Sequence, residues 1–249
     1  MISLVIPSSW REERLQILLE NLLEQCEAMP GAGVEIIVPL DYGRAEADPS
    51  PVLELMACWP SVRFLFSLDV GCWRATNLGI GYATNELIGW TADDALPHPG
   101  ALKAGVGRFQ TKFPDGLGLL VFNDLQHEGQ VAGHALTTKS FLRVLYGQNT
   151  TTTGFPDFDH WYCDTLTADR ARDLGRLHYA QDIIWEHQHW TVGKAERDRL
   201  NDANEVGEKK HRDKALKDRL DIEWIKNGYQ LAVEKLNAAA SFPSTGTAQ

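Results

Sequence analysis

The chain has 249 residues and a formal net charge of −10 at pH 7. This length is enough for one large α/β domain with an appendage. The acidic balance argues against a surface that binds duplex nucleic acid, although a local basic groove remains compatible with it. The four cysteines form no CxxC pair, which argues against a zinc knuckle or a disulfide framework. We find neither a membrane-length apolar stretch nor a signal peptide, so we expect a cytoplasmic protein.

Apolar strands and amphipathic helices alternate in the first hundred residues. Their short connections predict parallel strand–helix–strand units, and uninterrupted apolar strands suit a sheet covered by helices on both faces. Pro97 and Pro99 are expected to end strand pairing after residue 90. We expect strands at 2–7, 34–38, 62–66 and 86–90, and helices at about 12–28, 52–59 and 74–83.

The second half of the chain is less regular. Thr167 is expected to cap a helix that ends near Gly175. The segment 147–156 contains four consecutive threonines and is expected to form a mobile loop, and the dense mixture of charges after Gly193 indicates solvent-exposed helices. We expect other helices at 99–113 and 139–145, and strands at 117–123, 131–138, 179–180 and 183–190.

Polar side chains follow three of the early strands. They are Ser8, Asp41 and the adjacent pair Asp93 and Asp94. The carboxyl ends of parallel strands share one edge of a sheet, and ligands bind at that edge in open α/β folds. Paired carboxylates there suit a hard divalent cation such as Mg²⁺ or Mn²⁺. The competing interpretation is a solvated turn, because Asp is a common turn residue.

A predicted helix that follows Gly71 carries Arg74 and Asn77. The backbone N–H groups at the start of this helix, together with the guanidinium of Arg74, could bind a diphosphate. Gly79 and Gly81 lie inside the helix and form no phosphate-binding loop. We expect them to let the helix pack closely on the sheet.

The segment from Gly71 to Asp94 resembles the central signature of GT-A family glycosyltransferases, especially the large family-2 group. The opening strand and the 34–41 strand are similar too, so the resemblance covers roughly residues 2–100, with weaker echoes to about 190. It implies a GT-A (Rossmann-like) α/β fold, with a mostly parallel central sheet flanked by helices, and a nucleotide-sugar donor, a UDP-sugar first. The matching residues are Gly71, Arg74, Asn77, Gly79-Ile80, Ala83, Glu86-Leu87-Ile88 and Thr91-Ala92-Asp93-Asp94.

The resemblance also implies roles for residues of the first half. Ser8 and Asp41 would line the nucleoside pocket, Arg74 and Asn77 would lie beside the diphosphate or ribose, and Asp93 would hold the metal. Thr91 departs from the family pattern, because it stands where the first motif aspartate would be. Its hydroxyl can still bind a ribose or a metal-bound water, and Asp94 would compensate for the lost charge.

Two further roles fall in the second half. The family carries a catalytic carboxylate at the start of a late helix, for which we prefer Asp164 over Asp159; the competing interpretation of Asp164 is a helix cap. The family also often supplies a late histidine to the metal. We expect only one of His187 and His189 to enter the site and choose His187, and imidazole with carboxylate favours Mn²⁺ somewhat over Mg²⁺.

We therefore expect a catalytic domain over residues 1–192, with a nucleotide-binding half (1–98) and an acceptor half (99–192). A helical C-terminal extension (193–240) and a disordered tail (241–249) would follow, and the extension could mediate homo-oligomer formation.

The working hypothesis is a metal-dependent, inverting glycosyltransferase. Its acceptor is open: a saccharide, a protein, a small molecule or a hydroxylated nucleic-acid base, as in viral-type DNA-base glycosyltransferases. A non-catalytic nucleotide- or glycan-binding homologue is the alternative that Thr91 motivates. A nucleotidyltransferase is less favoured, since residues 8–20 contain no glycine-rich, lysine-bearing loop.

Overall fold

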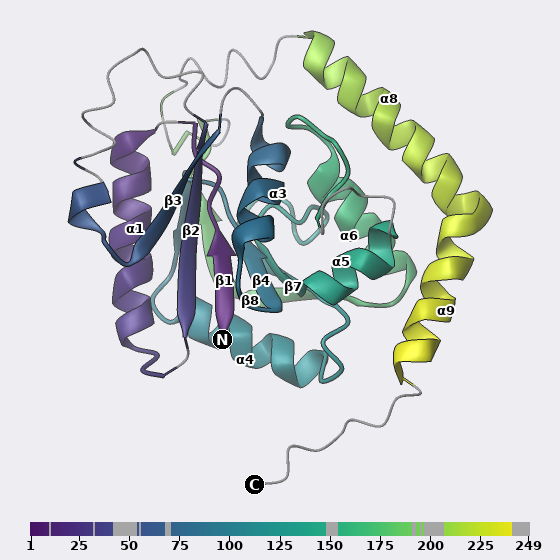
Figure 1. The fold of residues 1–249 in the computed structure, drawn as a ribbon, viewed down its shortest axis with the longest axis horizontal. Coiled ribbons are helices and arrows are strands. Elements are labelled where there is room, and N and C mark those ends of the chain that lie inside the picture. The colour runs from purple at the N-terminus through teal and green to yellow at the C-terminus, as the bar shows by residue number, and fades with distance from the viewer. Residues whose placement is uncertain are drawn as a thin grey trace, which may run out of the picture.

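Eight strands form one central sheet in the computed structural model, which describes residues 1–9, 11–31, 33–41, 54, 56–67, 71–147, 154–190, 193–194, 196 and 207–240 (Figure 1). Their order across the sheet is β3-β2-β1-β4-β7-β6-β8-β5. The strands are β1 (Ile2–Val5), β2 (Val34–Asp41), β3 (Val62–Ser67), β4 (Leu87–Trp90), β5 (Ala95–Pro97), β6 (Leu119–Asn123), β7 (Ala135–Thr138) and β8 (Leu177–His187).

Most of the sheet is parallel. β1 pairs in parallel with β2 and β4, β2 with β3, and β6 with β8, whereas β7 is antiparallel to both of its neighbours. The predicted α/β fold with a mostly parallel central sheet is therefore confirmed. The two expected late strands are one strand, β8, which is irregular after Phe122 of its partner β6.

The expectation that prolines end strand pairing after residue 90 was wrong. Ala95–Pro97 forms β5, which pairs antiparallel with β8 and places Ala95 opposite His187. Proline has no backbone N–H group to donate. It is tolerated in β5 because β5 is the edge strand of the sheet, and an outward-pointing N–H there would have no neighbouring strand to bind. This short strand is what brings the end of β8 to the Asp93–Asp94 turn.

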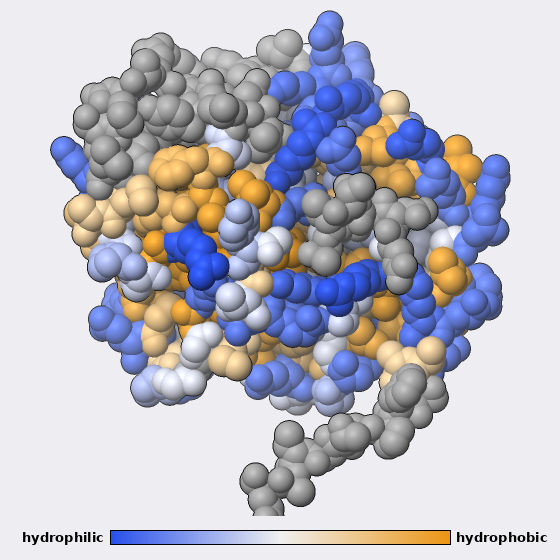
Figure 2. Space-filling view, viewed as in Figure 1, coloured by the Kyte–Doolittle hydropathy of each residue, from blue (hydrophilic) through white to orange (hydrophobic). Residues whose placement is uncertain are grey.

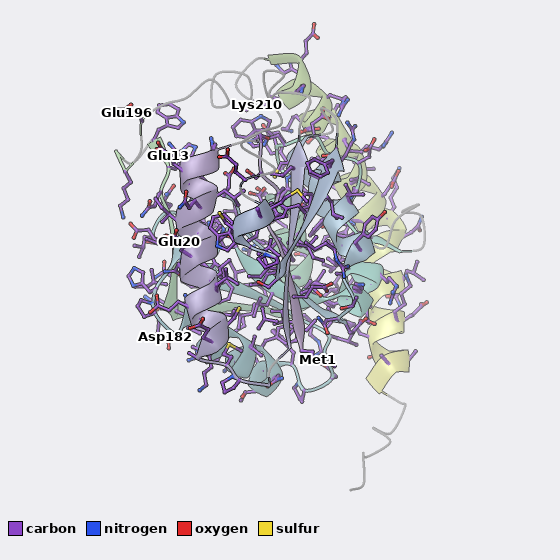
Figure 3. The ribbon with its side chains drawn as sticks, turned by 60° about the vertical axis from the view of Figure 1, so that its left-hand side comes forward. Met1, Glu13, Glu20, Asp182, Glu196 and Lys210 are labelled. Atoms are coloured by element: carbon purple, nitrogen blue, oxygen red, sulfur yellow. The ribbon has the colours of Figure 1, made fainter. Side chains whose placement is uncertain are left out.

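Helices cover both faces of the sheet, and adjacent residues of a strand serve opposite faces. Leu4 of β1 packs in a core cluster with leucines of α1 and Leu102 of α4, and Val5 packs in a second cluster with Ile80 of α3 and Phe141 of α5. The outward side of α1 is polar, as Glu13 and Glu20 show in Figure 3. The helices of this part are α1 (Glu12–Glu27), α3 (Cys72–Tyr82), α4 (Ala101–Lys112), α5 (Lys139–Tyr146) and α6 (Cys163–Asp173).

Thr167 does not cap α6 as expected. The helix begins at Cys163, four residues earlier, and the Thr167 hydroxyl donates to the Cys163 carbonyl 2.6 Å away inside the helix. Tyr162, which precedes α6, has a positive φ of 70°, so the chain turns sharply into this helix.

The C-terminal helices run along one side of the molecule (Figure 1). They are α8 (Gly207–Glu223), the π-helical turn η3 (Trp224–Gly228) and α9 (Tyr229–Ala240). Arg170 of α6 ties them to the sheet domain, because its guanidinium stacks on Trp224 and donates to the Leu220 carbonyl. The region of α8 is mostly hydrophilic in Figure 2, as its mixed charge predicts.

No helix among the described residues is long and apolar enough to cross a membrane. Most of the expected mobile loop (148–153) and the expected disordered tail (241–249) lie outside the described residues, as does most of the start of the predicted 52–59 helix.

Gly79 lies where α3 packs closely on the sheet, so the prediction of close packing is confirmed for Gly79 and wrong for Gly81. A Cβ at this position would collide with the Val5 side chain and lie 3.0 Å from Pro39 Cγ, whereas a Cβ on Gly81 would meet nothing within 4 Å. We expect Gly79→Ala to lower the free energy of unfolding by about 1–3 kcal/mol because of overpacking. Gly81→Ala is the matched control, and its effect on stability should be neutral or slightly stabilising. Chemical denaturation of both variants measures the difference. Equal stabilities of the two variants would contradict close packing at Gly79.

Candidate functional site at the carboxyl edge of the sheet

Asp93 and Asp94 lie in the turn that follows β4, and both are buried (4% and 6% exposed). β1 and β4 are parallel neighbours, so Ser8, which follows β1, reaches the same edge. Its hydroxyl donates to Asp93 Oδ2 at 2.7 Å. The predicted meeting of Ser8 with the acidic pair is therefore present, but this hydroxyl is engaged with the protein itself.

Arg11, just before α1, is a site residue that the sequence interpretation missed. Its Nη1 donates to Asp93 Oδ1 (3.2 Å) and to Asp94 Oδ2 (2.7 Å), and Nη1 of Arg14 lies 3.8 Å from the same Asp94 oxygen. Arg14 also donates to the carbonyl of Glu196, which lies near the Glu13 end of α1 (Figure 3). A signal was available, because cations at a helix N-terminus oppose the helix dipole and so indicate an acidic partner.

His187, at the end of β8, completes the group. Its Nε2 lies 3.2 Å from Asp94 Oδ1, and the next backbone N–H, of Gln188, donates to the Asp94 carbonyl at 2.8 Å. Burial works against ionisation of Asp94, but contact with His187 and the charge of Arg11 outweigh it and hold the pKa of this carboxyl well below its usual range. Asp94 is thus a carboxylate at neutral pH.

Both late histidines lie close together, and the contact with the acidic pair described above is that of His187. The rings of His187 and His189 lie 5.2 Å apart, centroid to centroid. β8 ends at His187, so His189 lies in the segment that directly follows the strand. The charge of Asp94 acts on the pKa of His189, although burial is the larger influence and lowers it.

The arrangement of Asp94 and His187 fits a divalent cation. Asp94 Oδ1 is a buried oxygen without an aligned hydrogen-bond donor in the described part of the chain. Its distance of 3.2 Å from His187 Nε2 is close to the roughly 3 Å that separates neighbouring ligands of an octahedral ion. Among the described residues no group of three or more His, Cys, Asp or Glu side chains could hold a metal, so phosphate and water would have to complete the coordination. Asp93 was predicted as the first ligand, yet both of its oxygens already accept hydrogen bonds.

Thr91 is turned into the core. It is 2% exposed, and its hydroxyl accepts from Trp185 Nε1 and meets His134 Nδ1, both at 2.9 Å. Burial and the nearby His187 lower the pKa of His134 to about 3, so this imidazole is neutral. The structure therefore does not place Thr91 to contact a ribose or a metal-bound water, because its hydroxyl is satisfied within the protein.

Asp164 lies in the first turn of α6. Its Oδ1 accepts from its own neighbour, Thr165 N, at 2.7 Å, which is a local contact and not the helix cap of the competing interpretation. Burial raises the pKa of Asp164. Burial also raises the pKa of the Cys72 thiol to about 12, with contributions from the charges of Asp93 and Asp164. Cys72, which the sequence interpretation did not single out, is therefore within electrostatic reach of both the acidic pair and Asp164.

Arg74 and Asn77 are engaged with the segment that leads to α6. Arg74 pairs with Asp157 (2.5 Å) and Asp159 (2.7 Å), and the Asn77 amide exchanges hydrogen bonds with both backbone groups of Phe155. Asp159, the other candidate for the catalytic carboxylate, also pairs with Arg212 of α8. These contacts join Arg74 and Asn77 to the 155–159 segment, not to the acidic pair. Asp41 ends β2 opposite Ser67, and its side chain is outside the described set.

A second oriented imidazole lies after β6. Asp124 is buried, its Oδ2 lies 2.6 Å from His127 Nδ1, and its carbonyl accepts from His187 N at 3.3 Å. The hydrogen bond with Asp124 raises the pKa of His127, which also feels the charge of Asp164. The turn thus holds an imidazole within electrostatic reach of Asp164.

We expect Asp124→Asn to lower the pKa of His127, because the amide cannot stabilise an imidazolium as a carboxylate does. A histidine with a raised pKa adds stability that is full below its ordinary value of about 6.5 and lost as pH rises through the folded-state pKa. The pKa of Asp124 is lowered against burial, mainly by its contact with His127, so its stabilising contribution is lost as pH falls below about 4. The stability advantage over Asp124→Asn should therefore be largest between about pH 4 and 6.5. Proton NMR titration of His127 and denaturation across pH measure both effects; an unchanged His127 pKa would show that the pair does not form.

Comparisons with known proteins agree with this architecture. The family model described as glycosyl transferase family 2 matches residues 3–162, which is more than half of the chain. No curated protein matches the sequence.

Two solved structures show the fold. The mannosyltransferase PcManGT from Pyrobaculum calidifontis, in complex with GDP-Man and Mn²⁺, has 20% identity and a TM-score of 0.60, with 98% of this chain and 76% of that chain covered. S. aureus TarS 1–349 in complex with UDP-GlcNAc has 14% identity and a TM-score of 0.55, with 74% of this chain covered. This chain spans only 57% of that TarS fragment. From the family match over residues 3–162, the chain belongs to glycosyl transferase family 2.

Proposed function

We propose that the chain transfers a sugar from a nucleotide-sugar donor to an acceptor hydroxyl, with inversion at the anomeric carbon. Beside the family match, one observation carries this proposal: the buried Asp93–Asp94 pair at the carboxyl edge of the sheet, with Ser8 and His187 in contact. The similar structures hold UDP-GlcNAc and GDP-Man. A UDP-sugar stays our first candidate donor, with a GDP-sugar second.

On the donor side, the residues at the ends of β1, β2 and β4 would shape the nucleotide site. Ser8 and Asp93 fix one another by a hydrogen bond, and Asp41 would act from the end of β2. Arg74 and Asn77 would support the site indirectly, because they hold the 155–159 segment that leads into α6.

Asp94 and His187 would hold a divalent ion, Mn²⁺ or Mg²⁺, with imidazole favouring Mn²⁺. When bound, such an ion supplies positive charge to the diphosphate that leaves the sugar. Asp94 is suited to this because its pKa is held low, so that the carboxylate stays ionised over the working pH range.

On the acceptor side, Asp164 would take the proton from the attacking hydroxyl. Burial raises the pKa of Asp164, which makes its carboxylate a better base near neutral pH than an ordinary aspartate. Asp159 is less suited, because its carboxylate is committed to ion pairs with Arg74 and Arg212. In an inverting reaction this base and the leaving diphosphate lie on opposite faces of the sugar.

The acceptor is proposed only as a hydroxyl compound: a saccharide, a protein, a small molecule or a hydroxylated nucleic-acid base. Association of two chains would use the apolar side chains that α8 and its continuation expose, Ile222, Ile225 and Leu231. These proposals rest on the sequence and on exposure.

The function is tested by incubating the full chain with UDP- and GDP-sugars, Mn²⁺ and a panel of acceptors, and by determining the anomeric configuration of any product by NMR. The expected product has the configuration opposite to that of the donor. Retention of configuration would contradict the role given to Asp164. Nucleotide binding without transfer or donor hydrolysis would favour the non-catalytic homologue.

A further inference from the structure

A positively charged side chain of the protein, Arg11, already contacts the acidic pair Asp93 and Asp94. One nitrogen of Arg11 reaches an oxygen of Asp93 (3.2 Å) and an oxygen of Asp94 (2.7 Å), and all three side chains are largely buried. Hydrogen bonds between a guanidinium and carboxylates are about twice as strong as those between neutral groups. Arg11 is therefore a fixed part of the site and not a surface side chain that happens to approach it.

Arg11 limits what the pair can offer to a second cation. Two carboxylates and one guanidinium leave a single net negative charge, and Arg14 adds further positive charge 3.8 Å from Asp94. Ser8 and Arg11 also occupy three of the four carboxylate oxygens. A divalent ion would find two protein ligands, Asp94 Oδ1 and His187 Nε2, and a guanidinium that repels it.

A nucleoside diphosphate would remove both limits at once. It brings phosphate oxygens that, together with water, would complete the coordination, and negative charge that offsets the repulsion by Arg11. We propose that Arg11 is a positioning residue that makes divalent-ion binding at Asp94 and His187 conditional on the nucleotide: the ion binds weakly to the protein alone and tightly together with the diphosphate. This inference rests on the proposed function for the identity of the nucleotide.

The same coupling works in the other direction. If the nucleotide raises the affinity for the ion by some factor, the ion raises the affinity for the nucleotide by the same factor. A nucleotide without its ion would then be held poorly, so the site would select the metal complex of the donor. If Arg11 only joined α1 to the β4 turn, its replacement would lower the stability of the protein. The factor by which the nucleotide raises the affinity for the ion would then stay unchanged.

The test is a Mn²⁺ titration of the full chain, followed by electron paramagnetic resonance of free Mn²⁺, without nucleotide and with saturating UDP or GDP. The unaltered protein should bind Mn²⁺ weakly alone and at least about tenfold more tightly with nucleotide. Without nucleotide, Arg11→Met should bind Mn²⁺ at least about tenfold more tightly than the unaltered protein does. The reason is that the guanidinium that repels the ion and pairs with Asp93 and Asp94 is gone. Arg11→Lys keeps the positive charge but places it on a shorter, more flexible side chain than the planar guanidinium, and its Mn²⁺ affinity should lie in between.

Arg108→Met is the matched control. Arg108 makes a two-pronged pair with Asp182 (3.1 and 2.9 Å), away from the acidic turn, so its loss should leave Mn²⁺ affinity unchanged. Asp94→Asn should abolish the tight binding with nucleotide and so locate the ion. Circular dichroism checks that each variant folds. If Arg11→Met does not fold, the inference is tested by Arg11→Lys and by the two Mn²⁺ titrations of the unaltered protein, with and without nucleotide.

Equal Mn²⁺ affinity with and without bound nucleotide would overturn the inference, and so would unchanged Mn²⁺ affinity in a folded Arg11→Met protein. Failure of the proposed function is a separate result. If neither UDP nor GDP binds in any variant, with or without Mn²⁺, the donor assignment fails, while the titrations without nucleotide still measure the effect of Arg11.

Discussion

Asp164→Asn is expected to lower the turnover number for sugar transfer by about 10²–10⁴-fold, the usual contribution of a general base. The amide has nearly the shape of the carboxyl group but cannot accept a proton from the acceptor. Donor affinity should change little, because Asp164 lies in α6 and the proposed donor contacts follow the strands of the first half. The loss should therefore fall on turnover and not on donor KM.

The pH profile gives a second readout. Burial raises the pKa of Asp164, and only the deprotonated form can act as a base. The rate of the unaltered enzyme should therefore fall as pH drops through this raised pKa, and Asp164→Asn should lose this acidic limb. A change that merely disturbed packing would lower the rate and leave the limb in place.

Asp169→Asn is the matched control for this experiment. Asp169 is on the same helix, but its side chain is half-exposed and pairs with Arg172 three residues later. Its replacement should leave the turnover number, the pH profile and the unfolding temperature close to those of the unaltered protein. Full activity of Asp164→Asn would remove Asp164 from the mechanism.

The sequence was sufficient for the parallel part of the site. A strand, a helix and a strand with short links predict parallel neighbours, so Ser8 and Asp93 were expected at one edge, and they meet by a hydrogen bond. Gly79 was expected to admit close packing of its helix and does so, whereas the space beside Gly81 is open. These features depend on local patterns, which a single sequence carries.

The other parts of the site depend on pairing between distant segments, which local patterns do not show. His187 was chosen for the site only from the family resemblance. His187 reaches Asp94 because β8 pairs with β5, some ninety residues earlier in the chain, and the prolines of that region concealed the short edge strand. Thr91 faces inward because Trp185, from the same β8, supplies a hydrogen bond. Arg11 directly precedes the first helix, where a cation opposes the helix dipole and so indicates an acidic partner. The sequence does not show which carboxylates that partner comprises, because Asp93 and Asp94 lie 82 and 83 residues away.

Asp213→Ala is expected to lower the free energy of unfolding by about 3–5 kcal/mol, because it leaves several buried N–H groups without an acceptor. Asp213 lies on α8 and is fully buried, although its helix is mostly exposed. Its Oδ1 accepts from Asp159 N (3.1 Å), and its Oδ2 accepts from His160 N and Trp161 N (both 2.9 Å). One carboxylate thus holds the whole turn that precedes α6.

The matched control is Asp218→Ala. Asp218 lies on the same helix but is exposed, and its solvent-screened ion pair with Lys214 four residues earlier should contribute little to stability. Denaturation by urea measures both variants. The free energy of unfolding of Asp213→Asn should lie between those of the unaltered protein and Asp213→Ala. One side-chain oxygen can still accept hydrogen bonds, whereas the amide NH₂ group at the other position faces N–H donors.

Because the turn leads directly to Asp164, loss of Asp213 should also reduce transfer activity under conditions where the protein is still folded. This would make α8 part of the catalytic unit, although the sequence suggested a separate extension from residue 193. Removal of α8 to α9 should then reproduce the loss of activity seen in Asp213→Ala. If Asp213→Ala is as stable and as active as Asp218→Ala, the C-terminal helices are an attachment that the site does not need.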